Sequence, residues 1–211
     1  MPIKRRDVLI LVSVWLLGCL IVLVLLGLFY ASNSAPAPDQ PKPIATFVIP
    51  TSGDTAKTAY RLALKPAQKW QQDVSMVAIS TYWPAAAIDN LGQAQGWDLR
   101  FYSPGRQRLY FTIVTTGQQV LGRAHLGKLR YPPPLIDPAQ WLIDSDEAIR
   151  TWANKGGGVF IKNFPGSRVE AILRQDPGRA RPVWDMLGIS ADQSQVFYLA
   201  IDATNGEVLN Q

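Results

Sequence analysis

Cysteine and histidine are almost absent from this sequence of 211 residues. The single cysteine is Cys19 and the single histidine is His125. A disulfide within the chain is therefore excluded, and a metal site or catalytic arrangement that needs two imidazoles cannot be formed. We interpret His125 as a surface or interface side chain. The chain must fold on an ordinary hydrophobic core, and we expect no catalytic, cofactor-binding or metal-binding residues.

Long runs of one charge are missing as well. The formal net charge is only +5, and the charged residues are dispersed. Proteins that bind nucleic acid usually concentrate Lys and Arg in a tract or on one face, so we expect no nucleic-acid partner. A small basic-aromatic patch is expected on one hairpin, where it either contacts anionic lipid or an acidic partner or is a solvated strand face. Its members are Arg100, Arg106, Arg108, Tyr102 and Tyr110.

The chain does contain one long hydrophobic run, from Val8 to Tyr30. As a helix it spans roughly 34 Å, which is enough to cross a hydrocarbon core of about 30 Å. A basic cluster at residues 4–6 directly precedes it and should stay in the cytoplasm. The sequence therefore predicts a single-pass protein of the cell membrane, whose partner is the lipid bilayer and whose C-terminal part is extracytoplasmic.

Two other interpretations of this segment remain open. A cleaved signal peptide has an apolar stretch of about 7–15 residues, and small residues at 31–35 offer a weak cleavage site. The sequence Leu-Leu-Gly-Cys at residues 16–19 resembles a lipobox, in which Cys19 is lipidated. The apolar run is long and continues past Cys19, which favours an uncleaved anchor.

The remaining chain divides by composition. A Pro-, Ala- and Ser-rich stretch, typical of an extended linker, follows the anchor, and a second stiff segment occurs at residues 131–134. The predicted organisation is a cytoplasmic tail at 1–7, a transmembrane helix at 8–30, a linker at 31–50, a first unit at 51–130 and a second unit at 131–211.

The two units share four features in the same order, which indicates an internal duplication. Each has a tryptophan three residues before an aspartate, a helix-like run, a Trp-Asp pair, and a β-rich segment that ends in a glycine turn. The matched residues are Trp70 and Trp141, the runs 74–81 and 145–155, Trp97-Asp98 and Trp184-Asp185, and the glycines Gly117 and Gly206.

In the second unit, Asp144 or Ser145 can cap a helix whose first turn contains Asp146 and Glu147. These carboxylates suggest a cation site, but helix capping explains them as well. Three glycines at 156–158 are interpreted as a helix stop, because a phosphate-binding loop would need a helix after them. Strands are expected at 169–173, 182–187 and 196–202, with a tight turn at 205–206.

In the first unit, helices are expected at 55–64, before Pro66, and at 67–79, and strands at 96–102, 109–115 and 119–126. The tryptophans either line a peptide groove or are repeated core residues, and we favour the core. They are Trp70, Trp83, Trp97, Trp141, Trp152 and Trp184.

The second unit resembles the PepSY family of small extracytoplasmic domains. The resemblance covers residues 141–152, 182–184 and above all 197–209, with the sequence FYLAIDATNGEVL. The first unit is similar but degenerate, since residues 117–120 lack the Asp and Glu of that closing turn. The resemblance implies an α+β fold of two PepSY-like or cystatin-like units, each a helix packed on an antiparallel sheet. It also implies a role in binding or restraining peptidases.

These observations together predict a non-enzymatic, membrane-anchored binding or regulatory protein. Its expected partner is an extracytoplasmic protein or peptide, with a peptidase as the favoured class. The alternative is a structural or assembly subunit of a cell-envelope complex.

Overall fold

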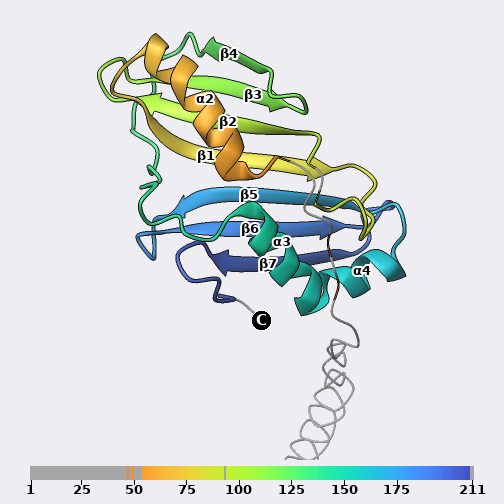
Figure 1. The fold of residues 1–211 in the computed structure, drawn as a ribbon. Coiled ribbons are helices and arrows are strands. Elements are labelled where there is room, and N and C mark those ends of the chain that lie inside the picture. Colours follow the sequence, from red (N-terminus) through yellow and green to blue (C-terminus); the bar gives the residue numbers. More distant parts are fainter. Residues whose placement is uncertain (1–46, 48, 50–53, 93, 210–211) are drawn as a thin grey trace, which may run out of the picture. The chain divides into compact units, whose positions relative to one another are not determined.

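The computed structural model describes residues 47, 49, 54–92 and 94–209. They form an α+β fold, in which one antiparallel sheet of seven strands has its helices on one face (Figure 1). The strands lie in the order β4-β3-β2-β1-β5-β6-β7. In chain order the elements are α2 (Ala56–Trp70), β1 (Ser75–Trp83), β2 (Gly96–Ser103), β3 (Arg108–Thr115), β4 (Val120–Ala124), α3 (Ser145–Trp152), a π-helical turn η1 (Ala153–Gly157), α4 (Gly158–Asn163), β5 (Arg168–Asp176), β6 (Arg181–Ile189) and β7 (Val196–Asp202).

Strands β1 and β5 join the two halves of the sheet. They pair antiparallel from Ala78, opposite Arg174, to Trp83, opposite Val169. On either side of this junction the chain runs from a helix into an antiparallel meander, α2 into β1–β4 and α3 into β5–β7. The sequence predicted a sheet in each unit, whereas the structure has a single continuous sheet.

The first half differs from the expected helix boundaries. One helix, α2, covers residues 56–70 and contains Pro66, where two helices were expected. Alanines on one face of α2 are fully buried and hold it against the sheet, so packing offsets the hydrogen bond that Pro66 cannot donate. The prediction of a helix-like run at 74–81 is also wrong, since these residues, from Ser75 on, form strand β1.

A β-bulge explains why β1 was missed. The register shifts between Met76 and Ala78, so Met76 and Ile79 both face the core although they are three residues apart. This spacing is typical of a helix, and it hides the alternation that identifies a strand. The six strands that the sequence predicted are all confirmed, with boundaries that differ by one to three residues at most ends.

The tryptophans belong to the core, as expected. Five of the six are buried, and Trp184 contacts both Trp97 and Trp141 at ring-centroid distances of 6.5 and 6.2 Å. Trp70, the exception, is partly buried and stacks on Tyr110 at a ring-centroid distance of 5.1 Å. Trp70 ends α2, however, while Trp141 precedes α3, so these two residues do not occupy equivalent places.

The expected tail at 1–7 and anchor at 8–30 lie outside the described residues, as does most of the linker at 31–50. None of the helices within the described ranges combines the length and apolarity that a membrane span requires. Phe47 and Ile49, at the end of the predicted linker, are buried in the core. The Phe47 amide donates to Asn154 Oδ1 at 2.8 Å.

Candidate functional site

Among the described residues, helices cover one face of the sheet and leave the other open. Helices α2 and α3 lie over the same side of it (Figure 1). In β2, Trp97, Leu99 and Phe101 point toward the helices and are buried, while the alternating Asp98 and Arg100 are exposed on the opposite side. We call this opposite side the open face. Because side chains alternate along a strand, the residues of the open face follow directly from the register.

A groove of about 580 Å³ runs along the open face over β2, β3 and β4. The register places two rows of side chains across it. One row is Arg100, Phe111 and Arg123, and the other is Asp98, Ile113 and Leu121. Ile113 and Leu121 are 45% and 62% exposed, which is unusual for large apolar side chains that share one surface. The groove therefore has an apolar floor with a guanidinium on each side of an aromatic ring.

The two arginines of the groove form no ion pair with any described residue. On the open face of the other half, over β5 and β6, the arginine charge is neutralised by an ion pair. There Arg174 pairs with Asp185, which also accepts from the Tyr198 hydroxyl at 2.5 Å. Burial and the hydrogen bond to Asp185 raise the pKa of Tyr198 to about 12. The groove over β2–β4 thus keeps a surplus of positive charge, from Arg100 and Arg123 against the single carboxylate of Asp98.

The two edges of the sheet also differ. Beyond β7, the segment at 207–209 continues the ladder, with hydrogen bonds of 2.8 Å from Asp202 N to Glu207 O and from Leu209 N to Ala200 O. Beyond β4, no described strand follows. Bonds from Thr115 N to Gln119 O and from His125 N to Leu109 O fix which groups of this strand face β3. The alternate residues, Val120, Gly122 and Ala124, direct their N–H and C=O groups away from the sheet.

The structure divides the predicted basic-aromatic patch between the two faces. Arg100 lies in the groove of the open face. Arg106 lies over the Trp70 ring at 5.8 Å, and Trp70 in turn stacks on Tyr110 on the helix side of the sheet. Tyr102 is buried. The sequence reasoning missed Arg123 and Leu121, although alternation along 119–126 would have placed both on the same face as Arg100.

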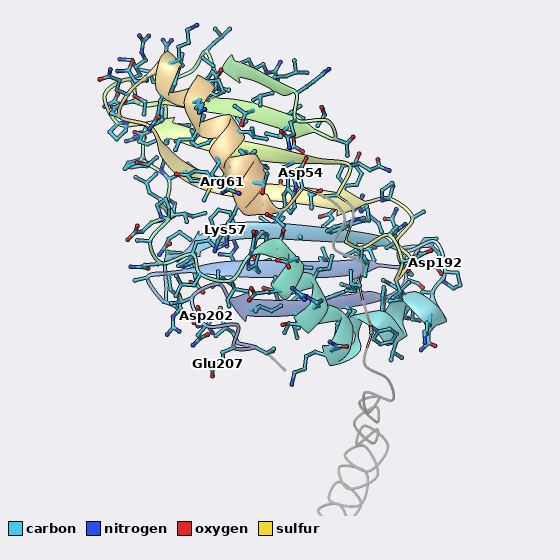
Figure 2. The ribbon with its side chains drawn as sticks, viewed as in Figure 1. Asp54, Lys57, Arg61, Asp192, Asp202 and Glu207 are labelled. Atoms are coloured by element: carbon cyan, nitrogen blue, oxygen red, sulfur yellow. The ribbon has the colours of Figure 1, made fainter. Side chains whose placement is uncertain are left out.

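The predicted carboxylate cluster serves helix capping. Asp144 Oδ1 accepts from Ser145 N at 2.7 Å, which caps α3, and from Lys57 N at 3.1 Å, in the first turn of α2. Lys57 Nζ donates to Leu142 O at 2.7 Å, which ties the start of α2 to the segment before α3 (Figure 2). Asp146 pairs with Arg150 at 2.6 Å, and Glu147 is exposed. No group of three potential ligands suited to a metal ion occurs among the described residues.

His125 is exposed at the end of β4, where its Nδ1 accepts from Gly127 N at 3.1 Å. A cavity of about 20 Å³ lies between the halves and is lined by Asp54, Trp83, Trp97 and Asp146 among others. This volume accommodates about one water molecule and no larger ligand.

The three glycines at 156–158 have a packing role. A Cβ atom added at Gly156 would lie 2.9 Å from the Phe197 ring. At Gly157 it would lie 2.3 Å from the Trp152 ring, and at Gly158 it would lie 2.4 Å from the Phe47 ring. The predicted helix stop is wrong, because helical structure continues through the glycines, from η1 into α4, which begins at Gly158. Aromatic rings occupy the space above them, which leaves no room for a phosphate.

The closing turn after β7 is held by Asp202, which Figure 2 labels. The Asp202 side chain is fully buried. Its carboxylate accepts from Thr204 N at 2.8 Å and pairs with the Arg181 guanidinium on β6. Burial by itself would raise the pKa of Asp202, but the hydrogen bonds from Thr204 and Arg181 outweigh it and lower that pKa. The turn residues 202–206 therefore have a structural role.

The comparison with family models finds a PepSY domain, described as "Peptidase propeptide and YPEB domain", at residues 159–211. The match covers most of α4, the strands β5–β7 and the closing turn. No curated protein and no solved structure matches the chain.

Proposed function

Starting from the PepSY domain at residues 159–211, we propose that this chain is a non-enzymatic binding or regulatory protein that acts on a peptidase or a peptide partner. The family match carries the proposal, because such domains are often peptidase propeptides or regulatory domains. The described residues support it in a second way, since the sheet offers an open face with a groove, and a free edge, on which an extended segment can lie.

The proposal includes a second, divergent PepSY-like copy in the first half. Both halves run from a helix into a meander, and Trp97 on β2 and Trp184 on β6 lie on the inner face of matching middle strands. Gly117 and Gly206, in the turns that follow β3 and β7, both have a positive φ, of 93° and 80°. The β1–β5 junction then lies on a local two-fold axis between the copies.

Affinity capture tests the regulatory role. The full chain, purified from solubilised membranes after cross-linking, should retain a peptidase that mass spectrometry identifies, and the purified chain should change the activity of that peptidase. A stable membrane complex without a peptidase would favour the assembly subunit instead. Capture of no partner at all would contradict both roles.

We also propose that residues 8–30 anchor the chain, with the described domain outside the cytoplasm. Because Cys19 is the only cysteine, a Cys19→Ser background allows single cysteines to be introduced. With Gly178→Cys, in the exposed turn between β5 and β6, a membrane-impermeant maleimide should label intact cells. Lys4→Cys should be labelled only after lysis. The reverse pattern, or recovery of the chain in the soluble fraction, would exclude this topology.

A further inference from the structure

The free edge of β4 and the groove beside it form one surface. Val120, Gly122 and Ala124 direct their N–H and C=O groups outward, and the ladder of β3 and β4 leaves these groups without partners among the described residues. Leu121 and Arg123 alternate with them and project into the groove on the open face. A strand added here would gain main-chain hydrogen bonds and side-chain contacts at the same time.

We propose that this edge binds an extended, acidic segment of a protein partner by strand addition. The proposal deepens the function given above and depends on it. The charge of the surface selects the occupant, because Arg123 and Arg100 form no ion pair with the described residues and outnumber the one carboxylate of the groove, Asp98. On the same face of the other half, Arg174 is neutralised by Asp185.

The register defines the sequence that the edge should accept. The main-chain N–H and C=O groups of Arg123 bond toward β3. In a new antiparallel pair Arg123 therefore occupies a non-hydrogen-bonded position, where opposing side chains are closest. The partner residue opposite Arg123 should therefore be Asp or Glu. The residue two positions away, opposite Leu121, should be apolar, since it would cover the exposed Leu121 and Ile113. Arg100 lies two strands from β4, about 10 Å away, and contributes through its field.

A display library of random twelve-residue peptides, selected against the full chain in neutral detergent micelles, tests this inference. We expect enrichment of peptides with a carboxylate two positions from an apolar residue. Arg123→Glu should shift the enriched residue to Lys or Arg, and should weaken binding of the wild-type selections about tenfold. Arg100→Glu should weaken it about twofold, because it is farther from the added strand.

Ala124→Pro tests the main-chain bonds. It removes one outward N–H and leaves the bonds to β3 in place, because proline is tolerated at such edge positions. Binding of the selected peptides should weaken about tenfold, while the matched Ala124→Val variant, which keeps the N–H, should stay within twofold. Thermal unfolding of both variants shows whether either has lost its fold. If Ala124→Pro does not fold, the effect of Arg123→Glu on peptide binding decides the test by itself.

Several outcomes would overturn the inference. These are the absence of enrichment, enriched peptides without acidic residues, and binding that is equal in Ala124→Pro and wild type. Binding to phosphatidylglycerol vesicles that Arg123→Glu abolishes, without peptide enrichment, would assign the surface to the membrane. A dimer that Ala124→Pro dissociates would assign it to a second copy of the chain. If Ala124→Pro still captures a peptidase as wild type does, the regulatory function stands and only the edge proposal fails.

Discussion

At the scale of single residues, the fold depends on close approaches that only glycine permits. The rings of Phe197, Trp152 and Phe47 cover Gly156, Gly157 and Gly158 in turn. Gly156 also has φ of 127°, a conformation that other residues rarely adopt. These contacts connect the helical segment from α3 to α4 with strand β7 and with Phe47, the first of the described residues.

Gly157→Ala should destabilise the protein. The new Cβ would lie 2.3–2.5 Å from ring atoms of Trp152, which is fully buried and cannot move without disturbing the core. Overpacking of this kind costs about 1–3 kcal/mol, which outweighs the better helix propensity of alanine. Urea unfolding measures the change. Gly178→Ala, in an exposed turn, is the control and should stay within about 0.5 kcal/mol of wild type.

Asp202→Asn should destabilise the protein at neutral pH, by about 1–3 kcal/mol, because Arg181 and Thr204 lose a charged acceptor. The folded-state pKa of Asp202 lies below its ordinary value of 3.8. A lowered pKa gives stability that is present above 3.8 and is lost as the pH falls through the folded-state value. The difference between variant and wild type should therefore shrink below pH 3.8. A difference that is unchanged at pH 2 would show that ionisation of Asp202 contributes nothing.

At the scale of elements, one side chain connects two helices. Asp144 caps α3 and accepts from the first turn of α2, so the positive ends of both helices meet at the same carboxylate. This arrangement couples the position of α2 on the first half of the sheet to that of α3 on the second half.

Asp144→Ala should reduce the free energy of unfolding by about 2 kcal/mol, the upper end for loss of a single cap, because two helix starts lose an acceptor. Asp137→Ala removes an exposed loop bond to Ala139 N and should change it by less than about 0.5 kcal/mol. Urea unfolding of both variants provides the measurement. Equal effects of the two substitutions would contradict the double capping role.

The sequence predicted most elements, because most strands alternate regularly and α3 has a clear capping residue. It failed at β1, where the bulge after Met76 gives the spacing of a helix, and at Pro66, which α2 tolerates because buried alanines hold it in place. The pairing of β1 with β5 joins segments about 90 residues apart, and no local pattern encodes it. The groove was only partly predicted for a different reason: Arg100 was identified, but the alternation along 119–126, which places Arg123 on the same face, was not used.

At the scale of the whole molecule, the two halves should unfold as one unit. They share the β1–β5 ladder, the contact of Trp97 with Trp184, and the bonds around Asp144. Calorimetry of the domain should therefore give a single transition with equal calorimetric and van't Hoff enthalpies. Trp97→Ala, in the first half, should lower the unfolding temperature of probes in the second half as well. Two resolved transitions would show that the halves are independent.

The β1–β5 junction has the geometry of a contact between two subunits, but it lies within one chain. A dimer assembled from separate subunits dissociates on dilution and must show the same surface twice. A junction within one chain stays closed at any concentration, and its two sides are free to diverge. Within the described residues the sheet already has this asymmetry: one outer edge is paired with residues 207–209, and the other ends at strand β4 with no further strand beside it. The strand addition proposed above would therefore place one partner on each chain, in a single orientation.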